Sequence, residues 1–530
     1  MDESPLDIDA LDIAALKALI LDLLEQGVAR DAEIAALRAE IRRLKGLNGP
    51  PDIKPSGMDK KARSRATAGR GANKRRRGKK KGSLKIDEKR VVTANAPKGS
   101  RFKGYEDYLI QDLICRPHTV LLRRERWLAP DGRYVVAPLP VGTRGHFGPE
   151  LRRFILAHYH GLQTSIERLV TLLADIGVVI SKRQIMRLLN DGQEEFVAEN
   201  NAVLHAGLES APWISVDDTG ARHQHRNGVT TQIGNDAFAW FGTSFSKSRL
   251  NFLSLLRAGH EDYVLNEAAF SYMAKRNLSG VVIALLAGAR EQHFADEAGW
   301  LAELHRLGIT GLKVNPDPIR IATEGALWGA LFAHGLLVDT VILSDDAGQF
   351  NIGNHALCWV HAERLIHKLD TFTDHHRREK ERIQARLWWL YADLKEYRNK
   401  PTRLRARQLA RRFDALFTSK TGFVTLDRLL RRLHAKRDDL LVVLEHPQVP
   451  LNTNGSENDI RAMVTRRKLS GGTKSETGKQ ARDTFIGLMK TCRKLGISYW
   501  DYLGDRLNVP GATAVPGLPT LVKQRCLEMA

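Results

Sequence analysis

Long hydrophobic runs are missing from this sequence. The longest apolar stretch, residues 280–289, is far shorter than the roughly 20 residues that a membrane-spanning helix requires. The N-terminus is acidic and lacks the basic and then apolar order of a signal peptide. We therefore expect a soluble, intracellular protein that has no membrane partner.

Cysteine is scarce as well. The 530 residues include 4 cysteines and no Cys-x-x-Cys pair: Cys115, Cys358, Cys492 and Cys526. Neither a disulfide framework nor a Cys-rich zinc module is indicated, and we expect four reduced thiols. The chain is long enough for several domains with hydrophobic cores of their own.

The net charge of +21 is spread unevenly along the chain. Residues 1–53 carry 6 basic and 11 acidic side chains, whereas residues 54–103 carry 19 basic and 3 acidic ones. Such a run predicts a polyanion-binding arm, with nucleic acid, acidic lipid and acidic protein as the candidates. Its density favours phosphate contact over simple solvation. The centre of the run is Lys74, Arg75, Arg76, Arg77, Lys79, Lys80 and Lys81.

The first half of the chain divides into four predicted segments. Residues 1–48 form an oligomerisation helix, because residues 11–44 show a heptad repeat with isoleucine at one core position and leucine at the other, which favours a parallel dimeric coiled coil. A helix packed on its own chain fits the short, interrupted repeat as well. Residues 49–101 have too few large apolar side chains to fold and are a disordered basic linker. Residues 102–145 are a small β-containing module with strand-like runs at residues 119–122 and 134–136.

The fourth segment, residues 146–200, resembles a helix-turn-helix. Three helices are predicted at residues 148–159, 165–176 and 181–189. The last opens on a capping box from Ser181 to Gln184, and its first turn is basic, with Lys182 and Arg183. We expect this helix to enter the major groove of DNA. Small helical bundles without DNA contacts give the same pattern.

Two apolar strands lead into carboxylate pairs. The run at residues 213–216 precedes Asp217 and Asp218, and the run at residues 338–343 precedes Asp345 and Asp346. A third acid, Glu457, opens a helix whose basic residues are Arg461, Arg466, Arg467 and Lys468.

Converging carboxylates on rigid elements suit a phosphodiester substrate. Two hard divalent cations about 4 Å apart can activate the attacking oxygen and stabilise the leaving one. Oxygen ligands favour Mg²⁺ or Mn²⁺. Each acidic pair alone also fits a turn or a helix cap, so it is the combination that indicates a site.

Three blocks in order carry a family resemblance. Asp217-Asp218-Thr219 comes first, Asp345 is followed by Cys358-Trp359-Val360-His361, and residues 452–461 read NTNGSENDIR. With a tail of small and basic residues, the chain from about residue 213 to residue 503 resembles the transposases of the insertion sequence 66 family. This resemblance implies the DDE class and a ribonuclease-H-like α/β catalytic domain with a helical insertion, preceded by the mainly helical DNA-binding region and the coiled coil.

The resemblance also implies roles for single residues. Asp217, Asp345 and Glu457 are the catalytic acids and metal ligands, and Asp218, Asp346, His361 and Cys358 support them. The catalytic domain comprises residues 201–375 and 451–510, the helical insertion residues 376–450, and the tail residues 511–530. The family's Asp and Arg in the third block are replaced by Asn452 and Asn458, so the geometry around Glu457 can differ. No zinc site is carried over, because the upstream cysteines of the family are absent.

We therefore expect a DNA transposase that hydrolyses phosphodiesters at transposon ends and transfers the freed strands into target DNA. Its partners are the terminal inverted repeats, target DNA, a second or further copies of the chain, and accessory proteins of the same element. Its place is the nucleoid of a bacterial cytoplasm. Two alternatives stay open: a domesticated DNA-binding regulator without catalysis, and a structure-specific nuclease of the same fold.

Overall fold

The computed structural model describes residues 86–93, 95, 97–140 and 146–529. Contacts within the chain define two units, Met1–Leu113 and Ile114–Ala530. The described residues of the first unit contain no helix or strand and are exposed. The expected coiled-coil helix and the basic run at residues 74–81 lie outside the described residues.

A short β-hairpin opens the regular structure of the second unit. Strand β1 (Arg126–Leu128) pairs antiparallel with β2 (Tyr134–Val136) around a turn in which Gly132 has a φ of 80°. The strand-like run expected at residues 119–122 is wrong, because these residues are irregular and exposed. Both strands of the hairpin are exposed too. The apolar residues of these strands therefore do not form a buried core among the described residues of this segment.

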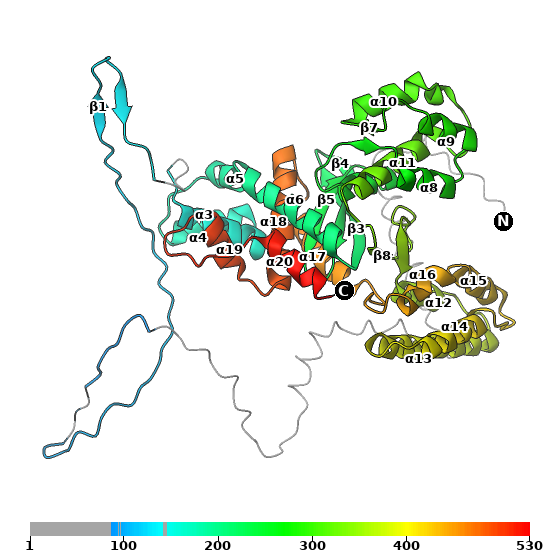
Figure 1. Cartoon of the computed structure of the whole chain (residues 1–530). Coiled ribbons are helices and arrows are strands. Elements are labelled where there is room, and N and C mark those ends of the chain that lie inside the picture. The colour runs from blue at the N-terminus through cyan, green and yellow to red at the C-terminus, as the bar shows by residue number, and fades with distance from the viewer. Residues whose placement is uncertain (1–85, 94, 96, 141–145, 530) are drawn as a thin grey trace, which may run out of the picture. The chain divides into compact units, whose positions relative to one another are not determined.

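The centre of the second unit is a mixed five-stranded sheet with the order β5-β4-β3-β8-β9 (Figure 1). Strands β3, β4 and β5 are antiparallel to one another in turn, whereas β8 is parallel to both β3 and β9. This arrangement confirms a mixed α/β fold. The strands are β3 (Trp213–His223), β4 (Arg226–Gly234), β5 (Ala239–Ser244), β8 (Val341–Ser344) and β9 (Asn354–Leu357).

Burial on both faces explains why β3 and β8 are central. Residues 213–216 and 341–344 are all buried, as continuous apolar runs in parallel strands usually are. Side chains alternate between the faces of a strand. Trp213, Val341 and Leu343 therefore share one small core, while Ile214 and Ile342 face the main core of the unit.

The helices before the sheet match the expected pattern. Ser181 and Gln184 form the predicted capping box, and α5 packs against α3, α4 and α18. The elements are α3 (Pro149–Leu156), the π-helical turn η2 (Ala157–Gly161), α4 (Ile166–Asp175), α5 (Lys182–Asn190) and α6 (Glu194–Ser210).

The long segment between β5 and β8 is mostly helical and packs into the main core. Helix α11 is buried over most of its length and contacts α7, α8 and the strand β6. The elements are α7 (Arg249–Leu256), β6 (Tyr263–Val264), α8 (Glu267–Lys275), α9 (Gly280–Ala287), β7 (His293–Phe294), α10 (Glu297–Arg306), η3 (Ile309–Gly311) and α11 (Pro318–Ala333).

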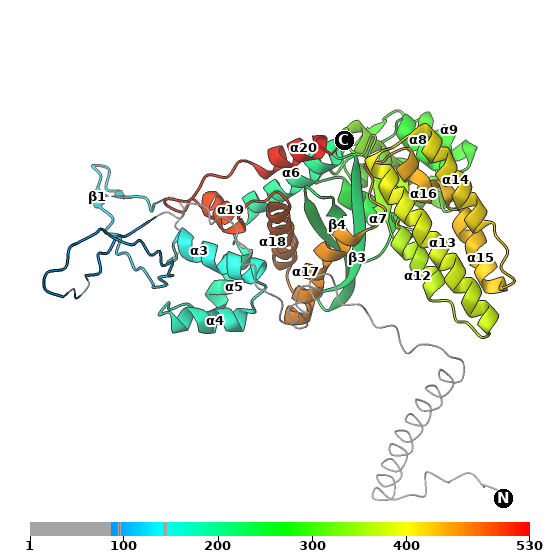
Figure 2. The ribbon, with the colours of Figure 1, turned by 90° about the horizontal axis from the view of Figure 1, so that it is seen from below.

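A second helical segment follows β9 and has a core of its own. The long helix α13 packs against α14, which in turn packs against α15, and the three lie side by side (Figure 2). The elements are α12 (Trp359–His367), α13 (Asp374–Asn399), α14 (Arg403–Phe417), α15 (Val424–His434), α16 (Arg437–Leu441) and η4 (Val442–Leu444).

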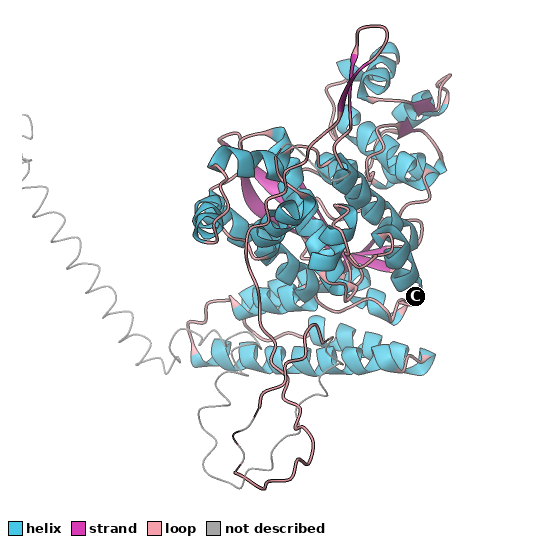
Figure 3. Cartoon of the chain, turned by 90° about the vertical axis from the view of Figure 1, so that its left-hand side faces the viewer, coloured by secondary structure: helices cyan, strands magenta, loops and turns pink. Residues whose placement is uncertain are grey.

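The C-terminal helices return to the sheet. Helix α17 lies against β3 and β4, α18 against β5 and α6, and α20 against α6. Figure 3 shows how far helix predominates over strand. No helix among the described residues is long and apolar enough to cross a bilayer. The elements are α17 (Asn454–Ser470), α18 (Glu476–Lys494), α19 (Tyr499–Arg506) and α20 (Leu518–Leu527).

Close packing of α11 on β6 predicts a sensitive glycine. A Cβ atom at Gly329 would lie 2.1 Å from the carbonyl oxygen of Val264, whereas one at Gly280 would meet no atom within 4 Å. We expect Gly329→Ala to lower the free energy of unfolding by about 2 to 3 kcal/mol, because backbone must move to admit the methyl group. Chemical denaturation measures the loss, and Gly280→Ala is the matched control. Equal stability of the two variants would contradict the close approach.

Candidate active site

Two of the predicted acids, Asp217 and Asp345, lie at the C-terminal end of the parallel β3–β8 ladder. The β3–β8 ladder pairs Trp213 with Val341 and Ser215 with Leu343. Extending this register by two residues brings Asp217 level with Asp345, on the same face of the sheet as those residues. Asp217 does not end its strand as expected, because β3 continues to His223 along β4 after β8 has ended.

Glu457 reaches this edge from the first turn of α17. Its Oε1 lies 3.5 Å from Nη1 of Arg364 and 3.9 Å from Nε2 of His361, both on α12. The same oxygen is buried and accepts no hydrogen bond within the described part of the chain. Beyond the end of α17, the Thr473 N–H donates to the Arg222 carbonyl at 3.0 Å, which ties this segment to β3.

Electrostatics show that the three carboxylates share one environment. Burial raises the pKa of Asp217 to about 6, and repulsion from Asp345, Asp218 and Glu457 adds to the shift, against a hydrogen bond from the Asp218 N–H. That N–H donates to Oδ1 of Asp217 at 2.8 Å. A carboxylate with a raised pKa beside two others, one with an unsatisfied oxygen, is a site that a cation would stabilise.

The neighbouring acids have other partners. Asp218 faces the opposite side of β3, where Gln349 donates to its Oδ2 at 2.7 Å and Lys247 forms an ion pair with it. Asp346 has a φ of 82° and pairs with Lys436. The structure therefore brings together Asp217, Asp345 and Glu457 and directs the second acid of each pair elsewhere.

Cys358 and His361 form a coupled pair beside the acids. Burial would raise the pKa of the Cys358 thiol, but hydrogen bonds with His361 and Thr453 hold it below its ordinary value. The bond with Cys358 raises the pKa of His361, and the charge of Asp345 adds to that shift. Arg364 opposes this shift, because its Nη1 lies 3.2 Å from Nε2 of His361.

The two asparagines of the third block have structural contacts. Asn452 donates to the Tyr391 hydroxyl at 2.9 Å and accepts the Asn454 N–H at 3.2 Å, so it links α13 to the start of α17. Asn458 is exposed, and its carbonyl accepts a hydrogen bond from Lys490 at 3.0 Å. The turn before Glu457 is thus held without the Asp of the family pattern.

The basic residues expected to contact DNA differ in their surroundings. Lys182 and Arg183 are exposed on α5, as are Arg461 and Lys468 on α17. Arg467 is partly buried and donates to the Gly220 carbonyl.

Arg466 requires a correction. Its side chain is buried, stacks 4.0 Å above the Tyr159 ring and donates to the carbonyls of Tyr159 and Thr164. It fastens α17 to the helices before the sheet and is not available to a phosphate. Arg466 was grouped with the other basic residues of α17 because of its place in the sequence. The sequence alone does not show which face of α17 packs against the helices before the sheet.

A basic surface that the sequence pattern did not single out lies on the second helical segment. Residues 374–444 contain 19 Lys and Arg against 9 Asp and Glu, which equals the whole +10 excess of residues 104–530. The charge balance of that segment was the signal that could have found it. Seven of its arginines are exposed and form no ion pair among the described residues: Arg378, Arg403, Arg407, Arg411, Arg428, Arg431 and Arg432.

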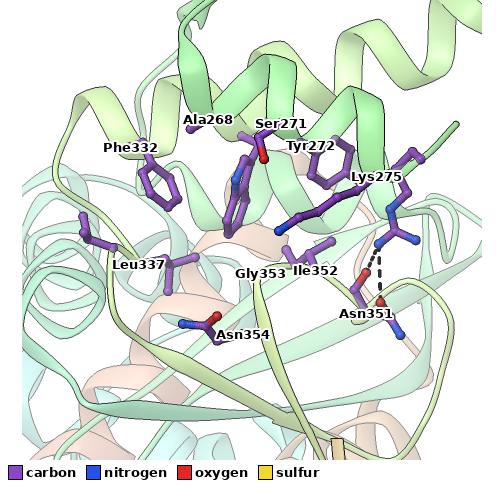
Figure 4. A pocket seen from close by; sticks show the side chains of 13 residues that line it. Ala268, Ser271, Tyr272, Lys275, Phe332, Leu337, Asn351, Ile352, Gly353 and Asn354 are labelled. Atoms are coloured by element: carbon purple, nitrogen blue, oxygen red, sulfur yellow. Dashed lines mark hydrogen bonds between the residues drawn. The ribbon is translucent and has the colours of Figure 1, made fainter. Parts of the chain in front are cut away.

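A cavity of about 390 Å³ lies behind the loop that follows Asp345, between α8, α11 and residues 351–354 (Figure 4). Arg276 donates to the backbone and side-chain oxygens of Asn351 at its rim. Its lining contains no Asp or Glu. The cavity is therefore separate from the carboxylate site, and its contacts fix the loop.

Comparison with known proteins identifies the family of the chain. The family model described as "Transposase IS66 family" matches residues 336–481, a range that includes Asp345, His361 and Glu457. The chain belongs to this family of transposases. It is also 50% identical over 314 residues to the uncharacterized protein y4jO of Sinorhizobium fredii (strain NBRC 101917 / NGR234), covering 59% of this chain and 97% of that protein.

The raised pKa of Asp217 predicts a pH-dependent stability. Protonation of this carboxyl favours the folded state, so its contribution is present at low pH and is lost as the pH rises through about 6. In EDTA, Asp217→Asn should raise the free energy of unfolding at pH 7.5 by on the order of 2 kcal/mol, and by much less at pH 4.5. Urea titrations at both pH values measure the difference.

Asp346, which is exposed, provides the control for the urea titrations of Asp217→Asn. Asp346→Asn removes a carboxylate that is paired with Lys436, so we expect no gain in stability at either pH. A gain for Asp217→Asn that is the same at both pH values would rule out the ionisation of the buried Asp217 carboxyl as its cause.

Proposed function

We propose that this protein is a DDE transposase that cleaves DNA at the ends of its element and joins them to target DNA. The observation that carries the proposal is the meeting of Asp217, Asp345 and Glu457, which come from β3, the end of β8 and α17. The sheet order, with three antiparallel strands followed by two parallel ones beside the first, supports a ribonuclease-H-like catalytic domain.

The residues fit a pair of divalent metal ions, Mg²⁺ or Mn²⁺. The donors are carboxylate oxygens, Oε1 of Glu457 accepts no hydrogen bond within the described part of the chain, and the raised pKa of Asp217 supports a missing positive charge at this edge. Asp217, Asp345 and Glu457 would hold the ions. When bound, the ions activate the attacking oxygen and stabilise the leaving oxygen of a phosphodiester.

The protein's own groups would orient the DNA around these acids. Arg364, half-exposed beside Glu457, can contact a phosphate of the bound strand. His361 lies at the same edge, with its Nε2 3.9 Å from Oε1 of Glu457. Lys247 and Gln349 hold Asp218 on the far face of β3, so that Asp217 keeps a fixed orientation.

The reaction consists of two phosphoryl transfers at one site. In the first, water attacks the phosphorus at the element's end and the 3′ oxygen leaves as a hydroxyl. In the second, that 3′ oxygen attacks a target phosphorus, the bond to the target's own 3′ oxygen breaks, and the proton passes to the leaving oxygen. Each step exchanges one phosphorus–oxygen bond for another, so it needs no covalent link to the protein.

The test is strand transfer with duplexes that carry the inverted repeats flanking the reading frame. Asp217→Asn, Asp345→Asn and Glu457→Gln should each lower the rate by at least 100-fold, because each removes a ligand charge. Asp346→Asn should retain most of the activity. Nicking without joined products would favour a structure-specific nuclease, and a gel shift without cleavage by the unaltered protein would favour a regulator. Transfer that survives Asp217→Asn would refute the assignment.

The basic surface of the second helical segment predicts a DNA contact. Replacing both Arg407 and Arg411 by Ala should weaken binding to duplex DNA several-fold and lower the salt dependence of log Kd by about 1 to 2, because each phosphate contact releases counterions. Fluorescence anisotropy at several salt concentrations measures both quantities. Arg290→Ala with Lys313→Ala removes the same charge from exposed positions between β5 and β8 and is the control. Identical salt slopes would exclude this surface from the interface.

A further inference from the structure

Another group of ionisable side chains lies outside the carboxylate site. His260, Asp262 and His334 each offer one nitrogen or oxygen atom, and these atoms all lie within 4.8 Å of one another. None of these residues belongs to the blocks that carry the family resemblance. We call this group the histidine cluster.

The fold brings the histidine cluster together from separate elements. His260 and Asp262 lie between α7 and β6, and His334 caps the C-terminal end of α11. His293 begins β7, which pairs with β6 opposite Val264, next to the loop that carries Asp262. The cluster therefore joins α11 to the β6–β7 pair.

The carboxylate of Asp262 is the centre of the histidine cluster. His334 Nε2 lies 2.9 Å from its Oδ1 and 3.0 Å from its Oδ2, and His293 Nε2 lies 3.0 Å from its Oδ2. The Asp262 side chain is only 12% exposed. These contacts place two imidazole nitrogens around one largely buried carboxylate.

Hydrogen bonding accounts for His334 and His293 but not for His260. The ring of His260 makes no hydrogen bond within the described part of the chain, and it stacks on His334 with 3.7 Å between centroids and 13° between planes. His260 therefore keeps a ring nitrogen for another partner, and that nitrogen lies within 4.8 Å of the ligand atoms of Asp262 and His334.

We propose that His260, Asp262 and His334 bind a divalent transition-metal ion of the zinc class. Imidazole nitrogens with one carboxylate suit such an ion, whereas the all-oxygen donors at Asp217, Asp345 and Glu457 suit magnesium. Three protein ligands leave one position of a four-coordinate ion to solvent. The ion would fix the end of α11, from which the chain leads into β8 and Asp345.

The test separates this site from the carboxylate site by using a full-length background with Asp217→Asn, Asp345→Asn and Glu457→Gln. Co²⁺ is titrated into the metal-free protein and followed by visible absorption, and Zn²⁺ content after dialysis is measured by atomic emission. We expect one equivalent of bound ion with the absorption of four-coordinate Co²⁺. Added Zn²⁺ should also raise the melting temperature of this background.

Variants in the histidine cluster give the decisive comparison. His334→Ala and Asp262→Asn should each weaken binding at least 10-fold and abolish the Zn²⁺-dependent rise in melting temperature. His305→Ala, at an exposed histidine of α10, is the control and should bind as the background does. If His334→Ala does not fold, Asp262→Asn decides, since it keeps the size and a hydrogen-bonding group of the side chain. A background that binds no ion, or equal binding by Asp262→Asn, overturns the proposal.

Discussion

Parallel pairing of β3 with β8 brings together two segments that are separated by the whole helical stretch between β5 and β8. The ladder covers only three residue pairs, from Trp213–Val341 to Ser215–Leu343, and every one of these residues is buried. A slip of one residue would turn Asp217 to the other face and expose its apolar neighbours. The buried runs thus fix the register, and the register fixes which acids meet.

Gathering three carboxylates is unfavourable in the isolated chain, and the surrounding contacts compensate for part of that cost. Asp218 and Asp346, which would add to the repulsion, each have a lysine partner. Arg364 lies next to Glu457, and hydrogen bonding to Cys358 favours the charged form of His361. What stays uncompensated is Asp217, whose pKa burial and the neighbouring carboxylates raise to about 6, and functional sites commonly retain such a local conflict because the ligand resolves it.

The sequence predicted the parts of the fold that depend on local patterns. Helix caps such as Ser181–Gln184 and the apolar runs of β3 and β8 are short-range signals, and the structure has them where the pattern placed them. Long-range packing was not accessible in this way. The burial of Arg466 depends on Tyr159, some 300 residues away in sequence, and the histidine cluster joins residues whose spacing resembles no motif.

The distribution of charge was also predicted only where it depends on local sequence. The basic run before residue 104 is plain from composition, and its residues 74–81 lie outside the described part of the chain. The totals alone do not show where the excess in the rest of the chain lies. Its concentration in residues 374–444 instead gives one helical segment a positive surface, whose exposed arginines could be identified only from the packing of α14 and α15.

The central claim is that Asp217, Asp345 and Glu457 form one divalent-metal site. Replacing Mg²⁺ by Fe²⁺ in the presence of ascorbate and peroxide tests it directly, because hydroxyl radicals cut the backbone next to the bound iron. The account predicts cuts close to these three residues, all suppressed by excess Mg²⁺ and all lost together in Asp345→Asn. Cuts at only one of the three segments, or cuts at these segments that persist in Asp345→Asn, would contradict it.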